Sequence, residues 1–183
     1  MRVIRTERLR LEPVTTENAG VLWDVLQLPG LRDYQDLPDA NREQFKRLVG
    51  ARPVSLEPGA SGRFEWLIYL EGVAEPVGWA SLRVGDRATT AEVGYSVVVE
   101  YRQRGIATET VRGLMNEAFA RTHLQKVRAY CVPANTASRA VLDTLGFEDD
   151  GILPRGATVQ GRPVDVVGFV MERSRWNSLQ KVP

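Results

Sequence analysis

The chain has 183 residues, of which 43% are hydrophobic and 26% are charged, a balance typical of a water-soluble globular protein with a sizeable core. Its 24 basic and 23 acidic residues are dispersed and give a net charge of +1, so we expect neither a nucleic-acid nor a membrane partner. No apolar stretch approaches the ~20 residues of a membrane span, and the N-terminus lacks the apolar segment of a signal peptide. We therefore expect a cytoplasmic protein.

The chain contains a single cysteine, Cys131, and a single histidine, His123. These counts exclude an intrachain disulfide, a zinc site rich in histidine and cysteine, and a triad that needs two such groups, and we expect no metal. His123 follows the end of a helical pattern and is interpreted as a surface residue without a chemical role. Cys131 ends an apolar strand pattern and is interpreted as a buried, inert thiol rather than a nucleophile.

The first part of the chain predicts one strand and two helices. Leu9 and Leu11 alternate with charged residues over residues 8–13, which indicates a half-exposed strand. Thr16 is placed to cap a helix whose apolar residues are Val21, Leu22, Val25 and Leu26. A second helix is expected over residues 42–49, with one side formed by Phe45, Leu48 and Val49. Residues 29–39 and 52–62 are rich in loop-forming residues and are predicted to connect these elements.

The middle of the chain predicts three strands in series, at residues 64–70, 77–84 and 91–99. The turns between them are short, so an antiparallel meander is expected. Residues 108–120 then place Val111, Leu114, Met115 and Ala118 on one helical face.

The last part alternates strands and helices. A strand is expected at residues 126–132, a helix at 136–145, and two closing strands at 147–153 and 164–172 around a loop at 154–163. The whole order predicts a mixed α/β domain, with antiparallel strands first and a strand–helix–strand–helix–strand unit after them.

The turn at residues 102–108 (Arg-Gln-Arg-Gly-Ile-Ala-Thr) lies between a predicted strand and a predicted helix. Gly105 allows a sharp turn and a close approach of the backbone to a ligand, because it has no Cβ. The free N–H groups at a helix start favour an anion such as a diphosphate. A plain strand-to-helix turn with a solvated basic edge is the alternative interpretation.

A second motif begins at Asn135, where Asn-x-x-Ser opens a helix that ends in Leu-Gly-Phe at residues 145–147. Asn135 as an N-cap and Gly146 as the residue after the helix explain the pattern on structural grounds alone. The two motifs together, about 30 residues apart, are more specific than either one.

With these motifs, the chain resembles the GNAT superfamily of acetyl-CoA-dependent N-acetyltransferases, and within it the RimJ/RimL branch that acts on ribosomal-protein N-termini. Residues 6–11 are similar to the first strand of that branch, residues 91–95 to its fourth strand, and residues 161–165 to its closing hairpin. The resemblance implies a single domain over residues 1–183 with its core at 6–172. It also implies a twisted seven-stranded mixed sheet, with the fourth and fifth strands splayed apart and helices on both faces.

The resemblance implies acetyl-CoA as co-substrate and assigns its contacts. The pantetheine arm would pair with backbone groups of Val97, Val98 and Val99, and the diphosphate would lie on the amides of Arg104, Gly105, Ile106, Ala107 and Thr108. Side chains of Arg102 and Arg104 would add charge-assisted contacts to phosphates, unless they are solvated loop arginines. Asn135 would hydrogen-bond the pantetheine arm, and Ser138 would face the thioester.

The reaction that the resemblance implies is a direct attack of a primary amine on the thioester in a ternary complex, which needs a neutral amine. Glu92 is the expected base, with a cross-strand ion pair as its alternative role, and Glu65 is a weaker substitute. Many relatives carry a tyrosine five residues before the phenylalanine of Leu-Gly-Phe, as the acid for the departing thiolate. That position is Leu142 here, so Ser138, Asn135 or a water is expected to supply the proton, and the Val98 amide to stabilise the oxyanion.

The acceptor amine is expected between the loop at residues 29–41 and the closing hairpin. Asp33, Asp36 and Asp39 outnumber Arg32 in that loop, which favours a cationic amine or is simply a solvated face. A protein N-terminus, a polyamine, an aminoglycoside and an amino-acid analogue all remain open, as do a monomer and a homodimer. A catalytically inactive module that binds acyl-CoA is the alternative function.

Overall fold

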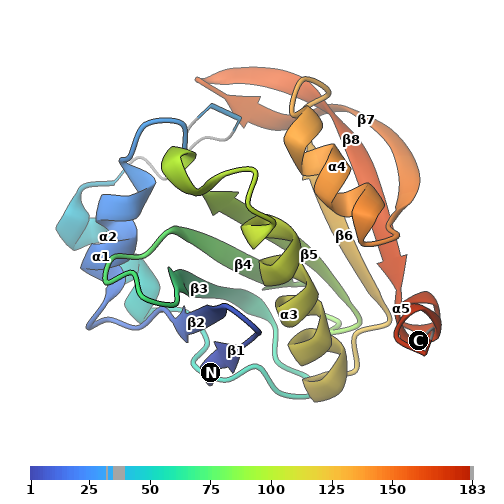
Figure 1. The fold of residues 1–183 in the computed structure, drawn as a ribbon, viewed down its shortest axis with the longest axis horizontal. Coiled ribbons are helices and arrows are strands. Elements are labelled where there is room, and N and C mark those ends of the chain that lie inside the picture. Colours follow the sequence, from blue (N-terminus) through green and yellow to red (C-terminus); the bar gives the residue numbers. More distant parts are fainter. Residues whose placement is uncertain (32, 35–39, 182–183) are drawn as a thin grey trace.

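The computed structural model describes residues 1–31, 33–34 and 40–181. These residues form one open sheet of eight strands in the order β1-β2-β3-β4-β5-β6-β8-β7, with helices on both faces (Figure 1). The predicted mixed α/β class is confirmed, although the resemblance implied seven strands. The additional strand is β1 (Ile4–Arg5), which is too short to produce a periodic sequence pattern.

The first five strands form the antiparallel part of the sheet. After β1 come β2 (Leu9–Pro13), β3 (Gly62–Leu70), β4 (Gly78–Val84) and β5 (Thr90–Val97), each paired with the one before it. This confirms the predicted meander. The last of these strands ends two residues earlier than expected, because the chain turns into a short 3-10 helix, η1 (Val99–Tyr101).

The second part of the sheet begins with a change of direction. β6 (Lys126–Cys131) is parallel to β5, and α3 (Ile106–Arg121) forms the crossover that a parallel pair requires. β8 (Arg162–Glu172) and the edge strand β7 (Glu148–Val159) follow in antiparallel order.

Helices cover the sheet on both faces. α1 (Ala19–Leu26) and α2 (Arg42–Gly50) pack against Leu67 and Trp79 on one face. The larger core on the other face contains residues of α3, α4 (Thr136–Thr144) and α5 (Arg173–Leu179). The predicted inner face of α3 is confirmed, since Val111, Leu114, Met115 and Ala118 are all fully buried.

Three expectations about the helices need correction. The residue that precedes α1 is Asn18, so Thr16 is not its N-cap. Leu48 of α2 is 48% exposed, while Phe45 and Val49 alone face the core. α5 was not predicted, because its only buried residue is Trp176 and, apart from the exposed Leu179, the rest of the helix is polar.

The predicted loop at residues 154–163 is wrong. β7 and β8 form one long hairpin that reverses at Gln160 and Gly161, whose φ angles of 51° and 73° suit a tight hairpin turn. The first half of β7 was predicted as a strand at residues 147–153, but nearly every residue of β7 is exposed, so its second half has no buried face and no alternating apolar pattern to reveal it.

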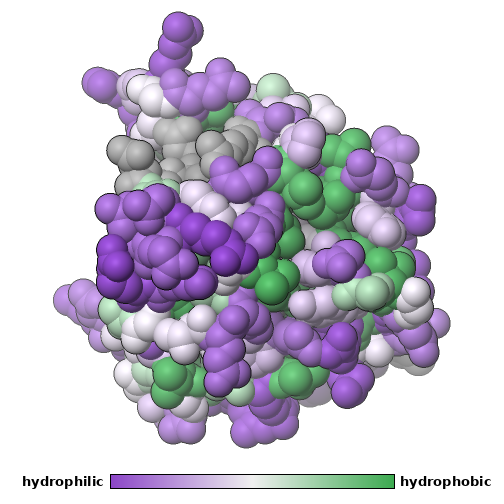
Figure 2. Space-filling model, turned by 90° about the vertical axis from the view of Figure 1, so that its left-hand side faces the viewer, coloured by the Kyte–Doolittle hydropathy of each residue, from purple (hydrophilic) through white to green (hydrophobic). Residues whose placement is uncertain are grey.

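The surface on the side of α1 and α2 is mainly hydrophilic, and its hydrophobic residues gather in several patches (Figure 2). No helix in the described part of the chain has the length and apolar composition needed to span a bilayer.

The burial of the inner face of α3 predicts how much stability is lost when one of its side chains is shortened. We expect Leu114→Ala to lower the free energy of unfolding by about 2–5 kcal/mol, because it removes a fully buried side chain. The matched change Leu48→Ala on the exposed side of α2 should stay within about 0.5 kcal/mol of the wild type. Urea unfolding followed by circular dichroism measures both values, and similar losses in the two variants would contradict the assigned faces.

Candidate active site

β5 and β6 separate soon after they meet. Their pairing is confined to Thr90, Ala91 and Glu92 of β5, opposite residues 126–128 of β6. We call the unpaired continuation, residues 93–97 of β5 and 129–131 of β6, the splay. Backbone groups alternate in direction along a strand, and β5 uses one set to pair with β4, so those of Tyr95 and Val97 face β6 without a β6 partner in the described structure. An extended ligand with amide groups fits such an edge.

The end of β5 changes the predicted pantetheine contacts. The Val98 N–H donates to the Val77 carbonyl at 2.9 Å, so the expected oxyanion role of this amide would require that bond to break. The carbonyls of Val98 and Val99 accept from Tyr101 and Arg102 within the turn. Of the three predicted residues, Val97 keeps an orientation toward the splay, and Tyr95 joins it.

The start of α3 carries backbone donors without side-chain caps. Gly105 is the N-cap residue with φ 75° and makes no side-chain cap hydrogen bond, and Gln103 also has a positive φ, of 60°. The first intrahelical bond of the turn runs from the Glu109 N–H to the Gly105 carbonyl, at 3.0 Å. The preceding N–H groups, at residues 106–108, therefore lack an intrahelical acceptor. We call residues 104–108 the cradle, because its geometry and partial positive charge suit an anion.

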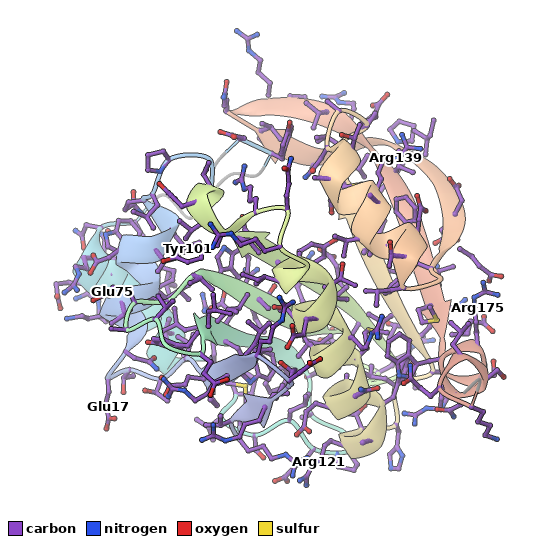
Figure 3. All side chains as sticks on the ribbon, in the orientation of Figure 1. Glu17, Glu75, Tyr101, Arg121, Arg139 and Arg175 are labelled. Carbon is purple, nitrogen blue, oxygen red and sulfur yellow. The ribbon has the colours of Figure 1, made fainter. Side chains whose placement is uncertain are left out.

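The two predicted phosphate-binding arginines differ in conformation. The Arg102 guanidinium donates to the carbonyls of Val97 and Gly30, both at 2.9 Å, so it joins the α1–α2 connection to the end of β5. Gly30 has φ 80°, and a Cβ there would lie 2.6 Å from Val99, so this contact requires glycine. The Arg104 guanidinium lies 5.4 Å from the ring centre of Tyr101, a residue labelled in Figure 3.

A third arginine, Arg8, approaches the cradle from the turn before β2, and no sequence pattern had indicated it. Arg8 donates to the Arg104 carbonyl at 3.1 Å and from Nε to Glu109 at 2.8 Å. Glu109 also accepts from the Thr6 hydroxyl and the Arg8 N–H. Burial alone would raise the pKa of Glu109, but these donors and the Arg8 charge lower it below its usual value. Because Arg8 neutralises Glu109, the carboxylate adds little repulsion for an anion at the cradle.

The other side of the splay is the first turn of α4. Asn135 caps the helix, since its Oδ1 accepts from the Ser138 N–H at 3.1 Å. The Tyr95 hydroxyl lies 2.9 Å from Ser138 Oγ and 3.2 Å from the Ser138 carbonyl oxygen, within hydrogen-bond distance of both. The position at which many relatives carry the tyrosine acid is here Leu142, which is fully buried, so this helix presents no such acid. Figure 3 shows Arg139 on this turn, across the splay from Tyr101. Tyr95 was not among the predicted site residues, although it shares the buried face of Val93 and Val97.

The predicted bases lie on the sheet face of α1 and α2. Glu92 accepts a hydrogen bond from Arg83 at 2.6 Å, so the cross-strand ion pair considered as its alternative role is present. Glu65 is only 3% exposed and is ion-paired with Arg52 and Arg63. Burial, followed by the nearby Arg63 charge, lowers the pKa of Arg52 to about 10. Glu65 is thus held by two arginines, whereas Glu92 is partly open to solvent. Of the predicted acceptor loop, Arg32, Asp36 and Asp39 lie outside the described residues.

Cys131 and His123 have the expected environments. Cys131 is buried on the splay side of β6, and burial raises the pKa of its thiol. His123 is exposed. The described residues contain no group of three or more histidine, cysteine or carboxylate side chains arranged to hold a metal ion.

A groove of about 900 Å³ lies on the β1 side of α3. It is bounded by residues 2–7 and by α3, and one end reaches Gly105 and Thr108. Part of the cradle therefore borders this groove.

The Glu109 network predicts a pH-dependent stability. At pH 7, Glu109→Gln should lower the free energy of unfolding by roughly 1–3 kcal/mol, because it removes charge-assisted bonds to Thr6 and Arg8. Since the folded-state pKa of Glu109 is lowered, its contribution is complete above the unfolded carboxyl pKa of about 4.3 and is lost as the pH falls below it. Denaturant unfolding at several pH values tests this, with exposed Glu7→Gln as control. A difference between wild type and Glu109→Gln that persists unchanged at pH 3 would contradict it.

Comparison with known proteins agrees with this geometry. The acetyltransferase (GNAT) domain family matches residues 8–148. The N-acetyltransferase p20 of Bacillus licheniformis, itself uncharacterised, is 29% identical over 172 residues, which cover 92% of this chain and 95% of that protein.

Solved structures share the fold. The ribosomal-protein α-N-acetyltransferase RimL, in complex with coenzyme A, superposes with a TM-score of 0.81 at 19% identity, covering 95% of this chain and 99% of its own. A GCN5-related N-acetyltransferase from Brucella melitensis gives a TM-score of 0.75 at 21% identity, covering 98% of this chain and 82% of its own. Because the family match spans most of the chain and includes both the splay and the cradle, the protein belongs to the GNAT acetyltransferase family and is an N-acetyltransferase.

Proposed function

We propose that the protein transfers an acetyl group from acetyl-CoA to a primary amine by direct attack in a ternary complex, within a single domain. The observation that carries the proposal is the uncapped start of α3 beside the unpaired edge of β5. The cradle provides donors for a diphosphate, and the β5 edge provides backbone groups for a chain of amides. Coenzyme A contains both, joined in that order.

The proposed cofactor position follows from these two features. The diphosphate lies on the amides of residues 104–108, with Arg104 as a nearby positive charge, while Arg8 balances Glu109 and holds the Arg104 carbonyl. The pantetheine arm runs along Tyr95 and Val97, and Asn135 on the opposite side uses its Oδ1 for the helix cap, which leaves its side-chain nitrogen as the group that would donate to the arm. The thioester then lies near Ser138, and Arg102 holds the end of β5 rather than a phosphate. The RimL structure with coenzyme A, which has this fold, supports the arrangement.

The reaction requires a neutral amine. Its lone pair forms the new C–N bond, the electrons of the C–S bond pass to sulfur, and the nitrogen loses a proton to a base. At pH 7, deprotonating an α-amino group costs about 1.4 kcal/mol and deprotonating a lysine about 4.6 kcal/mol. A partly solvated carboxylate acting through water is better matched to the first, so we propose an α-amino group, of a protein N-terminus or a small molecule, as the acceptor.

Glu92 is the proposed base. Glu92 is held by Arg83 and remains partly open to solvent, so a water between it and the amine can relay the proton. Glu65 is enclosed by Arg52 and Arg63 and lacks that access.

We expect Glu92→Gln to reduce turnover by about 10²–10⁴-fold, the usual contribution of a general base, with little change in acetyl-CoA affinity. Arg83→Gln removes the same ion pair but keeps the carboxylate, so it should retain most of the turnover. Exposed Glu75→Gln serves as the surface control. Thiol release with a panel of amines measures turnover, and calorimetry measures affinity. Unchanged turnover in Glu92→Gln would exclude Glu92 as the base, and binding without thiol release for every amine would favour the inactive acyl-CoA-binding module.

The single cysteine provides a test of where the cofactor thiol lies. The RimL structure contains a disulfide between coenzyme A and a cysteine of that enzyme, and Cys131 lies on the splay side of β6 in this chain. We expect incubation with the disulfide form of coenzyme A to add one coenzyme A to Cys131, slowly because burial raises the pKa of its thiol, and faster at alkaline pH. Intact-mass spectrometry detects the adduct, and Cys131→Ser is the control. An adduct whose formation acetyl-CoA does not slow would contradict the proposed position.

A further inference from the structure

We infer that Tyr95 is a positioning residue for the leaving group: its hydroxyl donates to Ser138 Oγ, which directs the serine proton toward the sulfur of coenzyme A. The inference rests on the proposed function, because it needs the thioester in the splay. It adds a residue that the resemblance did not assign.

The position of Tyr95 makes this contact possible. Tyr95 lies three residues beyond the last residue of β5 that pairs with β6, so its side chain reaches across the splay to α4. There it meets a fixed target, because the Ser138 backbone is held by the Asn135 cap. The hydroxyl-to-hydroxyl distance of 2.9 Å is that of a good O–H···O hydrogen bond.

The number of protons limits the possible arrangements. The Ser138 carbonyl can only accept, and Tyr95 has one proton to donate. If Tyr95 donates to the carbonyl, at 3.2 Å, the serine hydroxyl can donate to the tyrosine oxygen. Its proton is then not available for a hydrogen bond to the ligand. If Tyr95 donates to Ser138 Oγ, at 2.9 Å, the serine proton is free to point into the splay. The shorter contact belongs to the second arrangement.

Burial keeps Tyr95 a donor. It raises the pKa of the phenol well above its usual value, and this outweighs the opposing effect of the Ser138 hydrogen bond. Tyr95 therefore does not give up its proton during the reaction. It polarises the serine hydroxyl, since hydrogen bonds in a chain strengthen one another.

The reaction step then balances without a charge on tyrosine. As the C–S bond breaks, its electron pair passes to sulfur, and Ser138 donates a hydrogen bond to the thiolate. The excess proton of the nitrogen leaves through the base and solvent, and solvent later protonates the thiolate. Tyr95 and Ser138 end the cycle with the protons they began with.

The same contact has a competing role as a staple, by which we mean a purely structural link that holds β5 to α4. A staple affects folding and cofactor affinity, whereas a positioning role also changes the ionisation of the sulfur. The bound product, coenzyme A, reports on that ionisation directly, and no acceptor amine is needed.

The test is a pH titration of the coenzyme A thiol bound to the intact protein, followed by the ultraviolet difference absorbance of the thiolate. We expect Ser138→Ala to lower the thiolate fraction at fixed pH by about tenfold or more, the effect of losing a hydrogen bond to a charged group. Tyr95→Phe should give part of that loss, and the double variant should resemble Ser138→Ala, because Tyr95 acts through the serine. Tyr69→Phe, on β3 and outside the splay and the cradle, should leave the titration unchanged.

A titration that Ser138→Ala shifts and Tyr95→Phe does not would make Tyr95 a staple and overturn the inference. A titration that neither variant shifts would overturn it as well. Failure of the wild type to bind coenzyme A would instead overturn the proposed function on which this inference depends. If Tyr95→Phe does not fold, a ring-fluorinated tyrosine at position 95 keeps the shape and strengthens the donor, and it should raise the thiolate fraction above that of the wild type.

Discussion

The separation of β5 from β6 after three paired residues is the constraint on which the site depends. A strand that loses its neighbour leaves backbone donors and acceptors without partners, and such groups are costly unless water or a ligand satisfies them. The start of α3 adds a second set of open N–H groups a few residues later. One set suits an extended chain of amides and the other suits an anion. A ligand that satisfies both must join these chemistries within one molecule, which is why we propose coenzyme A rather than a simple nucleotide at this edge.

Three contacts hold the two sides of this opening in place. Arg102 links the end of β5 to Gly30, so the connection between α1 and α2 is held beside the unpaired edge of β5. Arg8 and Glu109 hold the turn before β2 against the first turn of α3. Tyr95 spans the splay to Ser138. Each contact joins segments that are distant in sequence. The proposed chemistry therefore uses a frame that the protein builds before a ligand arrives, which reduces the reorganisation needed during the reaction.

Sequence reasoning succeeded where a pattern is local. Leu114 and its neighbours repeat at helical spacing, and the cradle is a contiguous turn, so α3 and its start could be predicted. It failed where only the fold brings groups together. Nothing near Arg8 in the sequence indicates Gly105, and nothing near Tyr95 indicates Ser138. The sequence does not distinguish the two arginines of the turn. In the structure, Arg102 donates to two carbonyls and Arg104 lies over Tyr101. The second half of β7 was assigned to a loop for a different reason, since a strand segment without a buried face has no apolar alternation.

The proposed mechanism requires first of all that the cofactor lie along the β5 edge and on the cradle. Backbone amide chemical shifts, measured by NMR during a titration with acetyl-CoA, report on this position residue by residue. We expect the largest shifts at Tyr95, Val97 and residues 104–108, followed by Ser138. Shifts confined to residues 2–7 and the facing side of α3, which bound the neighbouring groove, would contradict it.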